Sequence, residues 1–561
     1  MPLIDHTTDV LVVGAGPVGL TAAGELRRRG VPVRVVDRLP ARLPYAKAVG
    51  IQPRTLEVWD RMGLVRDVLE AAVPMRGQMV YVNGAEQGAY DLVLPPEVPY
   101  GFAALPQYET ERILERFLAR FGTSIERGTE LVGFRQDQDG VTARLVTTSG
   151  PGGAAAPVHR EEEVRCRYLV GCDGAHSVVR KGLGLGFEGG AFPDEYMLAD
   201  VEVDWDLPAG YGVRAMHRGP DGAVDDVMVC IPLPGHGRYR ISTTAPPALS
   251  TAGRTRDTGA GRDAVAHGLE GGPAPGLADI QKVLDRLSPQ PVTASALRWS
   301  SVFRISHRIV DRYGEGRVFV AGDAAHIHPP TGAQGMNTGI QDAFNLAWKL
   351  ALAVEGAAHP ALLASYDAER RPVGEEVVGR TVRHAAEGVQ ADPEDPATLM
   401  LREAQLLVGY RGSPIVGSPD VAVDSARPRP GDRVPDCGGL TGPIATKALR
   451  LYDVLRERDH VLLLYGTGTG APDEGFEQLA RAAAESARGR LETCAVVRSA
   501  DAAADAGRLP VYRDTRGEFA RGFAAQAPTA FLVRPDGYLA ARLHQPAPQT
   551  LAACLARVFR A

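Results

Sequence analysis

The chain has 561 residues, of which 44% are hydrophobic and 23% are charged. This length fits about two to four domains, and the composition excludes collagen-like and wholly disordered proteins. The formal net charge of −6 provides no basic field for a polyanion, so we expect no nucleic-acid partner.

The 6 cysteines include no C-x-x-C pair, which excludes a disulfide framework or a structural zinc site and fits a reducing compartment. No apolar stretch approaches the ~20 residues of a membrane-spanning helix. The sequence also starts without a basic leader followed by a cleavage site. We therefore expect a cytoplasmic protein with no membrane partner.

The first forty residues carry the clearest signal. A buried strand is predicted at 9–13, followed by the turn Gly14-Ala15-Gly16-Pro17-Val18-Gly19, a helix at 20–29 and a strand at 31–36 that ends in Asp37. This is the βαβ arrangement that binds dinucleotides. The glycines permit a tight turn, the approach of a pyrophosphate and close helix packing, and the acid accepts from a ribose hydroxyl.

Further elements follow in chain order. The residues between 196 and 245 alternate as short strands, including 227–233 and 239–243, and predict an antiparallel sheet inserted into the first domain. A mobile loop is predicted at 251–276. The remaining predicted elements are helices at 53–62, 110–121 and 339–354 and strands at 168–174 and 317–321.

Beyond a turn-rich linker, the last 130 or so residues predict a separate α/β unit. Its predicted strands are 460–465 and 529–533, and its predicted helices are 476–487 and 549–558.

A second informative stretch, 322–337, runs from a Gly-Asp turn through a loop rich in proline and glycine into a helix. Such a loop presents backbone N–H groups to a group that carries or develops negative charge. We expect no metal at His326 and His328, because no third and fourth ligand lies at a suitable spacing.

Three motifs resemble single-component FAD-dependent aromatic monooxygenases of the phenol hydroxylase and aromatic polyketide hydroxylase type. They are GAGPVG at 14–19, CDGAHSVVR at 172–180 and GDAAHIHPPTGAQGMNTGIQDAFNLAWKL at 322–350. The resemblance covers residues 5 to about 385. Segments 430–436 and 532–537 resemble members that add a C-terminal thioredoxin-like domain, which here lacks C-x-x-C and therefore fits a packing or dimerisation role.

The resemblance implies an α/β fold: a Rossmann-like FAD-binding domain, an inserted antiparallel β-sheet substrate domain and a C-terminal thioredoxin-like α/β domain. We assign the FAD-binding domain to 1–190 and 290–395, and the substrate-binding sheet to 191–289 with parts of 75–105. A linker at 396–431 then leads to the thioredoxin-like domain at 432–561.

The resemblance also implies site residues. Gly14, Gly16 and Gly19 would hold the FAD pyrophosphate, Asp37 the adenosine ribose and Arg38 the adenine. Gln107 would contact the ribityl side of FAD, and Asp323 would bond the ribityl chain or the pyrophosphate. Asp173 lies in a segment linked to FAD and the nicotinamide cofactor. The N–H groups of Gly335, Met336 and Asn337 would face the flavin pyrimidine, where charge develops on reduction. No catalytic side chain is assigned in the flavin-facing loop, whose marked residues are Pro329, Gly332 and Gly335.

The chain departs from the family in having Lys47 where many relatives have arginine, and His176 in the central motif. Lys47 is either a point donor to the nicotinamide cofactor or a solvated surface lysine, while Arg54 fits a structural salt bridge. Candidate lining of the substrate cavity, with plain core as the alternative, comprises Tyr81, Phe102, Met197, Met216 and Met228.

The activity implied is hydroxylation of a phenolic, polycyclic or polyketide substrate through a flavin C4a-hydroperoxide, with FAD as cofactor, NADPH or NADH as co-substrate and O2 as oxidant. No enzymic nucleophile is needed, because a phenolate is itself nucleophilic. Baeyer–Villiger insertion, epoxidation, FAD-dependent double-bond reduction and a non-enzymatic flavin-binding module are the alternatives. A homodimer is a further expectation.

Overall fold

The structure is a computed structural model that describes residues 8–44, 48–149, 158–249, 268–269, 274–387, 394–417, 427–442, 444, 447–466, 474–498, 509–526 and 528–560. Lys47 lies outside these residues, as does most of the loop predicted at 251–276. Within that loop, Gly268–Leu269 form a short strand, β16. None of the helices in the described ranges has the length and apolar character of a transmembrane segment.

The first layer is a mixed sheet whose central strands are parallel, as the βαβ pattern predicts. Its strands are β1 (Thr8–Val13), β2 (Val33–Asp37), β8 (Ile125–Arg127), β9 (Thr129–Gln136), β10 (Val141–Ser149), β11 (Val158–Gly171), β18 (Gly314–Glu315) and β19 (Val318–Val320). They lie in the order β18-β19-β11-β1-β2-β8, and β10 and β9 continue from β11. Strand β1 pairs in parallel with both β2 and β11.

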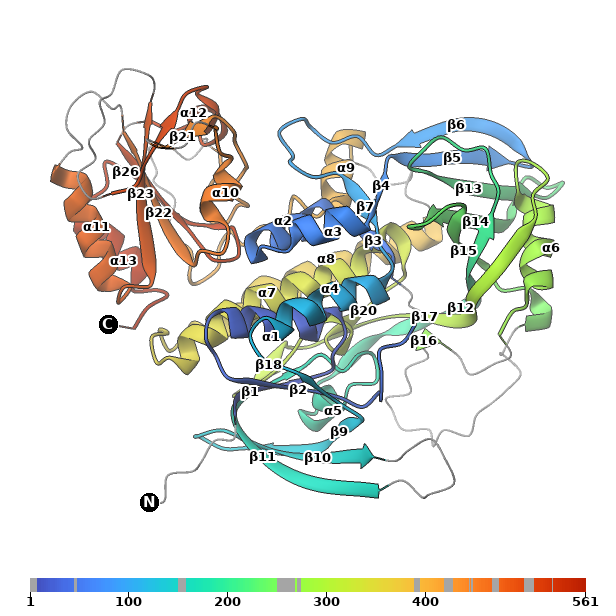
Figure 1. Cartoon of the computed structure of the whole chain (residues 1–561), viewed down its shortest axis with the longest axis horizontal. Helices are drawn as coiled ribbons and strands as arrows, with labels where there is room; N and C mark the ends of the chain where they lie inside the picture. Colours follow the sequence, from blue (N-terminus) through green and yellow to red (C-terminus); the bar gives the residue numbers. More distant parts are fainter. Residues whose placement is uncertain are drawn as a thin grey trace.

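Helices stack above this sheet (Figure 1). They are α1 (Pro17–Arg28), α2 (Pro53–Met62), α3 (Val65–Ala71), α4 (Gln107–Ala119), α7 (Gln334–Val354) and α8 (Ala364–Glu387), while α5 (Val178–Gly182) contacts β9. Helix α7 packs against α1 and is buried on nearly all sides. It begins at Gln334, five residues before the predicted start, because the polar residues there are buried rather than exposed in a loop.

A second, nine-stranded sheet lies beside the first layer (Figure 1). It contains β5 (Gly77–Val82), β6 (Ala85–Asp91), β12 (Phe187–Val203), β13 (Tyr211–Arg218), β14 (Val224–Pro232), β15 (Arg238–Thr244), β16, β17 (Ala294–Val310) and β20 (His326–Ile327). The predicted antiparallel pairing is observed throughout except between β5 and β13, which are parallel. Helix α6 (Leu277–Leu287) covers one face of this sheet.

Between the two sheets lies a small three-stranded one of β3 (Gly50–Ile51), β4 (Val73–Met75) and β7 (Phe102–Ala104). Short 3-10 turns are η1 (Pro247–Leu249), η2 (Gly322–Ala324) and η3 (Thr331–Ala333).

The C-terminal unit has its own sheet, in the order β21-β24-β23-β22-β25-β26. Its elements are β21 (Leu440–Thr441), α10 (Leu451–Leu455), β22 (His460–Gly466), α11 (Glu474–Ser486), β23 (Leu491–Arg498), β24 (Val511–Asp514), α12 (Glu518–Gly522), β25 (Thr529–Val533), β26 (Leu539–His544) and α13 (Pro548–Leu555). Strands β22 and β23 are parallel, and the β25-β26 hairpin joins antiparallel to β22 and leads into α13. This β-α-β, hairpin, helix order is the predicted thioredoxin-like arrangement.

Charged side chains attach this unit to the helices of the first layer. Arg54 pairs with Glu57, as predicted, and also donates to the carbonyl of Asp536 at 2.8 Å. The carboxylate of Glu57 is shared with Arg433 of the C-terminal unit at 2.8 Å. Buried Arg61 donates to the carbonyls of Leu455, Arg534 and Pro535. Helix α2 therefore contributes three charged side chains, Arg54, Glu57 and Arg61, to the interface with the C-terminal unit.

The stretch 396–431, predicted as a linker, contains structure of its own. Helix α9 (Pro396–Glu403) is capped by Asp395, whose carboxylate accepts from two N–H groups of the first turn. The residues that follow include the buried side chains of Gln405 and Tyr410. This stretch packs against α8 and the start of α7 instead of only connecting two domains.

Candidate functional site

The three motif glycines of the turn between β1 and α1 have different roles. Gly14 has a φ of +101°, and a Cβ there would overlap the carbonyl of Cys172. A Cβ on Gly19 would overlap the carbonyl of Gly14, so both glycines are required by the chain itself. A Cβ on Gly16 would have no atom within 4 Å. Gly16 therefore borders open space exactly where α1 presents its unpaired N–H groups.

Asp37 closes the turn from the end of β2. Its two carboxylate oxygens accept from the N–H groups of Ala15 at 2.7 Å and Leu39 at 2.8 Å. Each oxygen keeps a further lone pair that a ribose hydroxyl could use. Arg38 is exposed beside it.

Asp173 serves the local fold. Its carboxylate accepts from the Ser177 hydroxyl at 2.6 Å and from the N–H groups of Val178 at 2.7 Å and Val179 at 3.1 Å. Burial raises the pKa of Asp173, although these hydrogen bonds oppose the shift. The carboxylate is thus committed to the start of α5, while its backbone lies next to Gly14.

The second loop meets the first at α1. Gly322 has a φ of +62°, and a Cβ there would lie 2.9 Å from the Val18 side chain in the first turn of α1. The next residue, Asp323, is exposed at this junction. The Gly-Asp turn and the glycine turn therefore lie side by side, although about 300 residues separate them in the sequence.

The flavin-facing loop, which contains η3 and runs directly into α7, is held from within the chain. Gly332 and Ala333 have left-handed φ values of +69° and +55°. The Asn337 amide accepts from the N–H of Gln52 at 2.9 Å and donates to the carbonyl of Gly50 at 2.9 Å. The Asn337 side chain is therefore structural. Its N–H and those of Gly335 and Met336 belong to the first turn of α7, which lacks internal acceptors.

Two histidines support this loop. His326 Nε2 lies 2.8 Å from a carboxylate oxygen of Asp342, whose other oxygen accepts from Arg370 at 2.7 Å. Burial lowers the pKa of His328 to about 3, so this ring is neutral and places Nδ1 2.8 Å from the carbonyl of Pro329. Within the described ranges, neither histidine belongs to a group that could hold a metal ion.

Gln107 opens α4. Its side chain donates to Glu111 at 2.9 Å, and its N–H donates to the carbonyl of Ala48. Burial raises the pKa of Glu111 to about 7, although the hydrogen bond from Gln107 opposes the shift.

The five residues predicted to line the substrate cavity fall into different environments. Tyr81, Met197 and Met228 lie in the apolar core between the second sheet and α6. These three are core residues and face away from the flavin-facing loop. Met216 is half-buried on the other face, and Phe102 packs against Met400, Ala404 and Leu406 in and after α9.

Sequence reasoning missed Glu403 at the end of α9. Its carboxylate accepts from Arg380 and, at 3.1 Å, from Gln334. A Cβ on Gly332 would collide with the same carboxylate, so Glu403 lies directly against the flavin-facing loop. Nothing in the local pattern of a turn-rich stretch could have indicated this contact.

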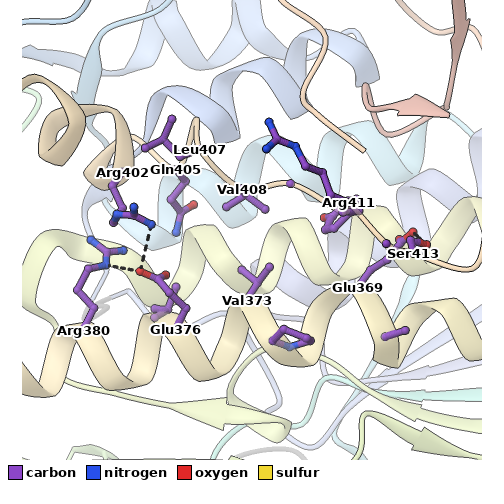
Figure 2. Close-up of a pocket in the computed structure, with 16 residues that line it drawn as sticks. Glu369, Val373, Glu376, Arg380, Arg402, Gln405, Leu407, Val408, Arg411 and Ser413 are labelled. Carbon is purple, nitrogen blue, oxygen red and sulfur yellow. Dashed lines mark hydrogen bonds and ion pairs between the residues drawn. The ribbon is translucent and has the colours of Figure 1, made fainter. Parts of the chain in front are cut away.

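A cavity of about 320 Å³ lies next to Arg380, between α8 and segment 405–413 (Figure 2). The arginines of its lining are paired: Arg380 and Arg402 with Glu376, which also lines it, and Arg411 with Asp432 outside it. The bonds from Gln405 to Gln334 and from Arg380 to Glu403 lie between this cavity and the flavin-facing loop.

Comparison with known proteins adds to this geometry. A family model described as FAD binding domain matches residues 7–381, and one described as aromatic-ring hydroxylase, C-terminal, matches residues 427–561. The chain is 35% identical over 469 residues to a flavin-dependent monooxygenase of Mycobacteroides abscessus, covering 82% of this chain and 88% of the relative.

It is also 32% identical over 551 residues to the anhydrotetracycline monooxygenase of Streptomyces rimosus, covering 95% of this chain and 94% of the relative. Among solved structures, a ternary complex of aklavinone-11 hydroxylase with FAD and aklavinone matches with a TM-score of 0.75 at 27% identity. That match covers 99% of each chain.

Proposed function

We propose that this chain, which belongs to the FAD-binding aromatic-ring hydroxylases, is a monooxygenase that hydroxylates a phenolic polycyclic substrate with O2 and NADPH or NADH. The observation that carries the proposal is the meeting of the glycine turn and the Gly-Asp turn at the start of α1. Both loops there belong to the part of the chain matched by the FAD-binding model.

The residues present fit FAD. Gly16 leaves room for a pyrophosphate at a helix N-terminus, and Asp37 keeps lone pairs for a ribose hydroxyl. We assign Gly14, Gly16, Gly19 and Asp323 to the pyrophosphate and ribityl side. When bound, FAD supplies hydride acceptance from NADPH or NADH and the activation of O2.

The chain itself contributes the positions of the donor groups and the electrostatic field that they create. Asn337, Gln52 and Gln334 fix the flavin-facing loop through their side chains, so the N–H groups at the start of α7 are oriented before any ligand arrives. Fixed N–H groups stabilise developing negative charge without reorganisation. Gln107 is assigned to the ribityl side, and Asp173 acts by holding α5.

The polyketide substrate class rests on relatives. Anhydrotetracycline and aklavinone are named in the two matches above, and this chain matches both proteins along nearly its whole length. The homodimer and the cytoplasmic location stay predictions, to be checked by light scattering and cell fractionation.

The test is turnover of fused-ring hydroxyquinones under labelled dioxygen, followed by mass spectrometry. We expect one labelled oxygen atom in the product and no product without oxygen. An unlabelled, saturated product formed equally well without oxygen would replace this proposal with a double-bond reductase. A labelled ring-expanded lactone or an epoxide would move the reaction to Baeyer–Villiger insertion or epoxidation.

A further inference from the structure

Arg214 occupies an unusual position in the second sheet. Its neighbours in β13, Val213 and Ala215, point into the apolar core against α6. Because side chains alternate along a strand, Arg214 points to the opposite face. In Figure 1 that face lies toward the helices of the first layer, on the side of α8 and α9.

Another arginine on this face is paired: Arg240, in β15, forms a buried ion pair with Asp200. Arg214 is half-buried, yet no hydrogen bond or ion pair joins it to any residue in the described ranges. Burial lowers the pKa of Arg214, and the charge of Tyr90 opposes this shift. Uncompensated burial of a charge is costly and is normally avoided.

The surroundings of Arg214 connect it to the flavin-facing loop. Tyr90, in β6, lies on the same face, because it pairs with Gln78 opposite Gly212. Burial and then the charge of Glu403 raise the pKa of Tyr90, whereas the charge of Arg214 lowers it. Tyr90 also packs against the cluster that includes Met400 and Ala404, which flank Glu403 in the chain. Since Glu403 touches Gly332, these three residues extend from the sheet to the loop.

We propose that Arg214 is the anion-binding residue of the substrate site, and that it holds the ionised oxygen of a phenol or enol together with an adjacent carbonyl oxygen. This inference rests on the proposed function, because it takes an aromatic substrate as the ligand. On binding, the O–H bond of the phenol breaks, the proton passes to water and the oxygen keeps the electron pair. The planar guanidinium donates to two neighbouring oxygens, a geometry that lysine cannot reproduce.

Such binding would also prepare the substrate for oxygen transfer. A phenolate ring is a stronger nucleophile than the neutral phenol, and a cation fixed at its oxygen keeps it ionised at neutral pH. Arg214 would thus select substrates with an acidic hydroxyl beside a carbonyl over simple phenols.

The test uses 1,8-dihydroxyanthraquinone, whose colour changes on ionisation, and the oxidised, FAD-loaded protein without NADPH or NADH. The pKa of the bound probe and its dissociation constant are measured by visible absorption across pH. The variants are Arg214→Met, which keeps the stem without the charge, and Arg214→Lys. The control is Arg218→Met, because Arg218 is exposed in the same strand and bonds only to a turn carbonyl.

With the natural chain and with Arg218→Met, we expect bound probe to have a pKa at least about one unit below that of free probe. Arg214→Met should abolish this shift and weaken binding of the ionised probe by about tenfold or more, and Arg214→Lys should recover only part of both. Equal shifts and equal affinities in Arg214→Met and the natural chain would overturn the proposal.

Flavin content and circular dichroism confirm that each variant is folded, and Arg214→Lys decides the matter if the methionine variant is not. Because no turnover is involved, the outcome is independent of the proposed reaction. A shift that depends on Arg214 in a protein that incorporates no labelled oxygen would sustain the binding residue and refute the monooxygenase. Incorporation of labelled oxygen without an Arg214-dependent shift of the probe's pKa would refute only the proposed role of Arg214.

Discussion

Replacing Arg534 tests how the C-terminal unit is held. Arg534 lies just after β25, fully buried, and donates to Glu369 of α8 at 2.6 Å and to Asp536 at 2.5 Å. Lys349 of α7 binds the other oxygen of Glu369 at 2.7 Å. Two cations and two carboxylates thus balance inside the junction, and Arg534→Met removes one of the cations while keeping most of the side-chain volume.

The expected loss follows from what remains. Asp536 would keep only the neutral donors Asn345 at 3.2 Å and Trp348 at 3.3 Å, and Glu369 would retain Lys349. Breaking a buried ion pair by removing one partner costs about 3–5 kcal/mol, because a buried charge is left uncompensated. Restoring the balance with Arg534→Met together with Asp536→Asn should therefore cost less than Arg534→Met alone.

The measurement is equilibrium urea unfolding followed by circular dichroism, with FAD in excess. The control is Arg516→Met, since Arg516 is exposed in the same unit and makes only a long contact with Glu518. An Arg534→Met chain within about 1 kcal/mol of the natural one, or a double variant less stable than the single, would refute the charge-balance argument.

Two further outcomes are expected. Gly16→Val should fold normally, because a Cβ at this position meets no protein atom. The variant should lose FAD on gel filtration, with FAD affinity reduced by about 100-fold or more, because the pyrophosphate loses charge-assisted bonds to the turn. Full flavin content in this variant would contradict the assignment. Glu111 has a pKa of about 7 in the folded chain, against 4.5 for an ordinary glutamate. Between pH 4.5 and 7 the folded chain therefore keeps a proton that the unfolded chain releases. The contribution of Glu111 to the free energy of unfolding falls by up to about 3 kcal/mol over this pH range. Glu111→Gln should flatten this part of the pH profile of urea unfolding, and an unchanged profile would argue against the raised pKa.

The βαβ unit could be predicted with element bounds within three residues of those observed, because its signal is local: a strand, a glycine turn, a helix and an acid in one continuous stretch. The surroundings of the candidate substrate residues could not be predicted in this way. Alternation of apolar side chains in β5, β12 and β14 shows that one face of each strand is buried. It does not indicate which element packs against Tyr81, Met197 and Met228. That cover is α6, which is distant in sequence from all three strands.

The same limit applies to Asp173 and Glu403. A carboxylate next to a motif looks like a cofactor contact, and only the positions of Val178 and Val179 show that Asp173 caps a helix. Glu403 follows a turn-rich stretch, and its contact with Gly332 depends on how α9 packs on α8. A single sequence does not reveal the role of a side chain when that role depends on residues that are distant in the chain and close in space.

The cysteines bear on the durability of such an enzyme. All six lie among the described residues as free thiols, and burial raises the pKa of every one, to about 12 for Cys166 and Cys494. Peroxide attacks the thiolate, whose fraction at pH 7 is on the order of 10⁻⁵ for a pKa near 12, against about 3% for an ordinary exposed cysteine. An oxygenase that releases hydrogen peroxide when its substrate fits badly generates an oxidant beside its own chain. The raised pKa of all six thiols would slow the oxidation of these cysteines by such peroxide.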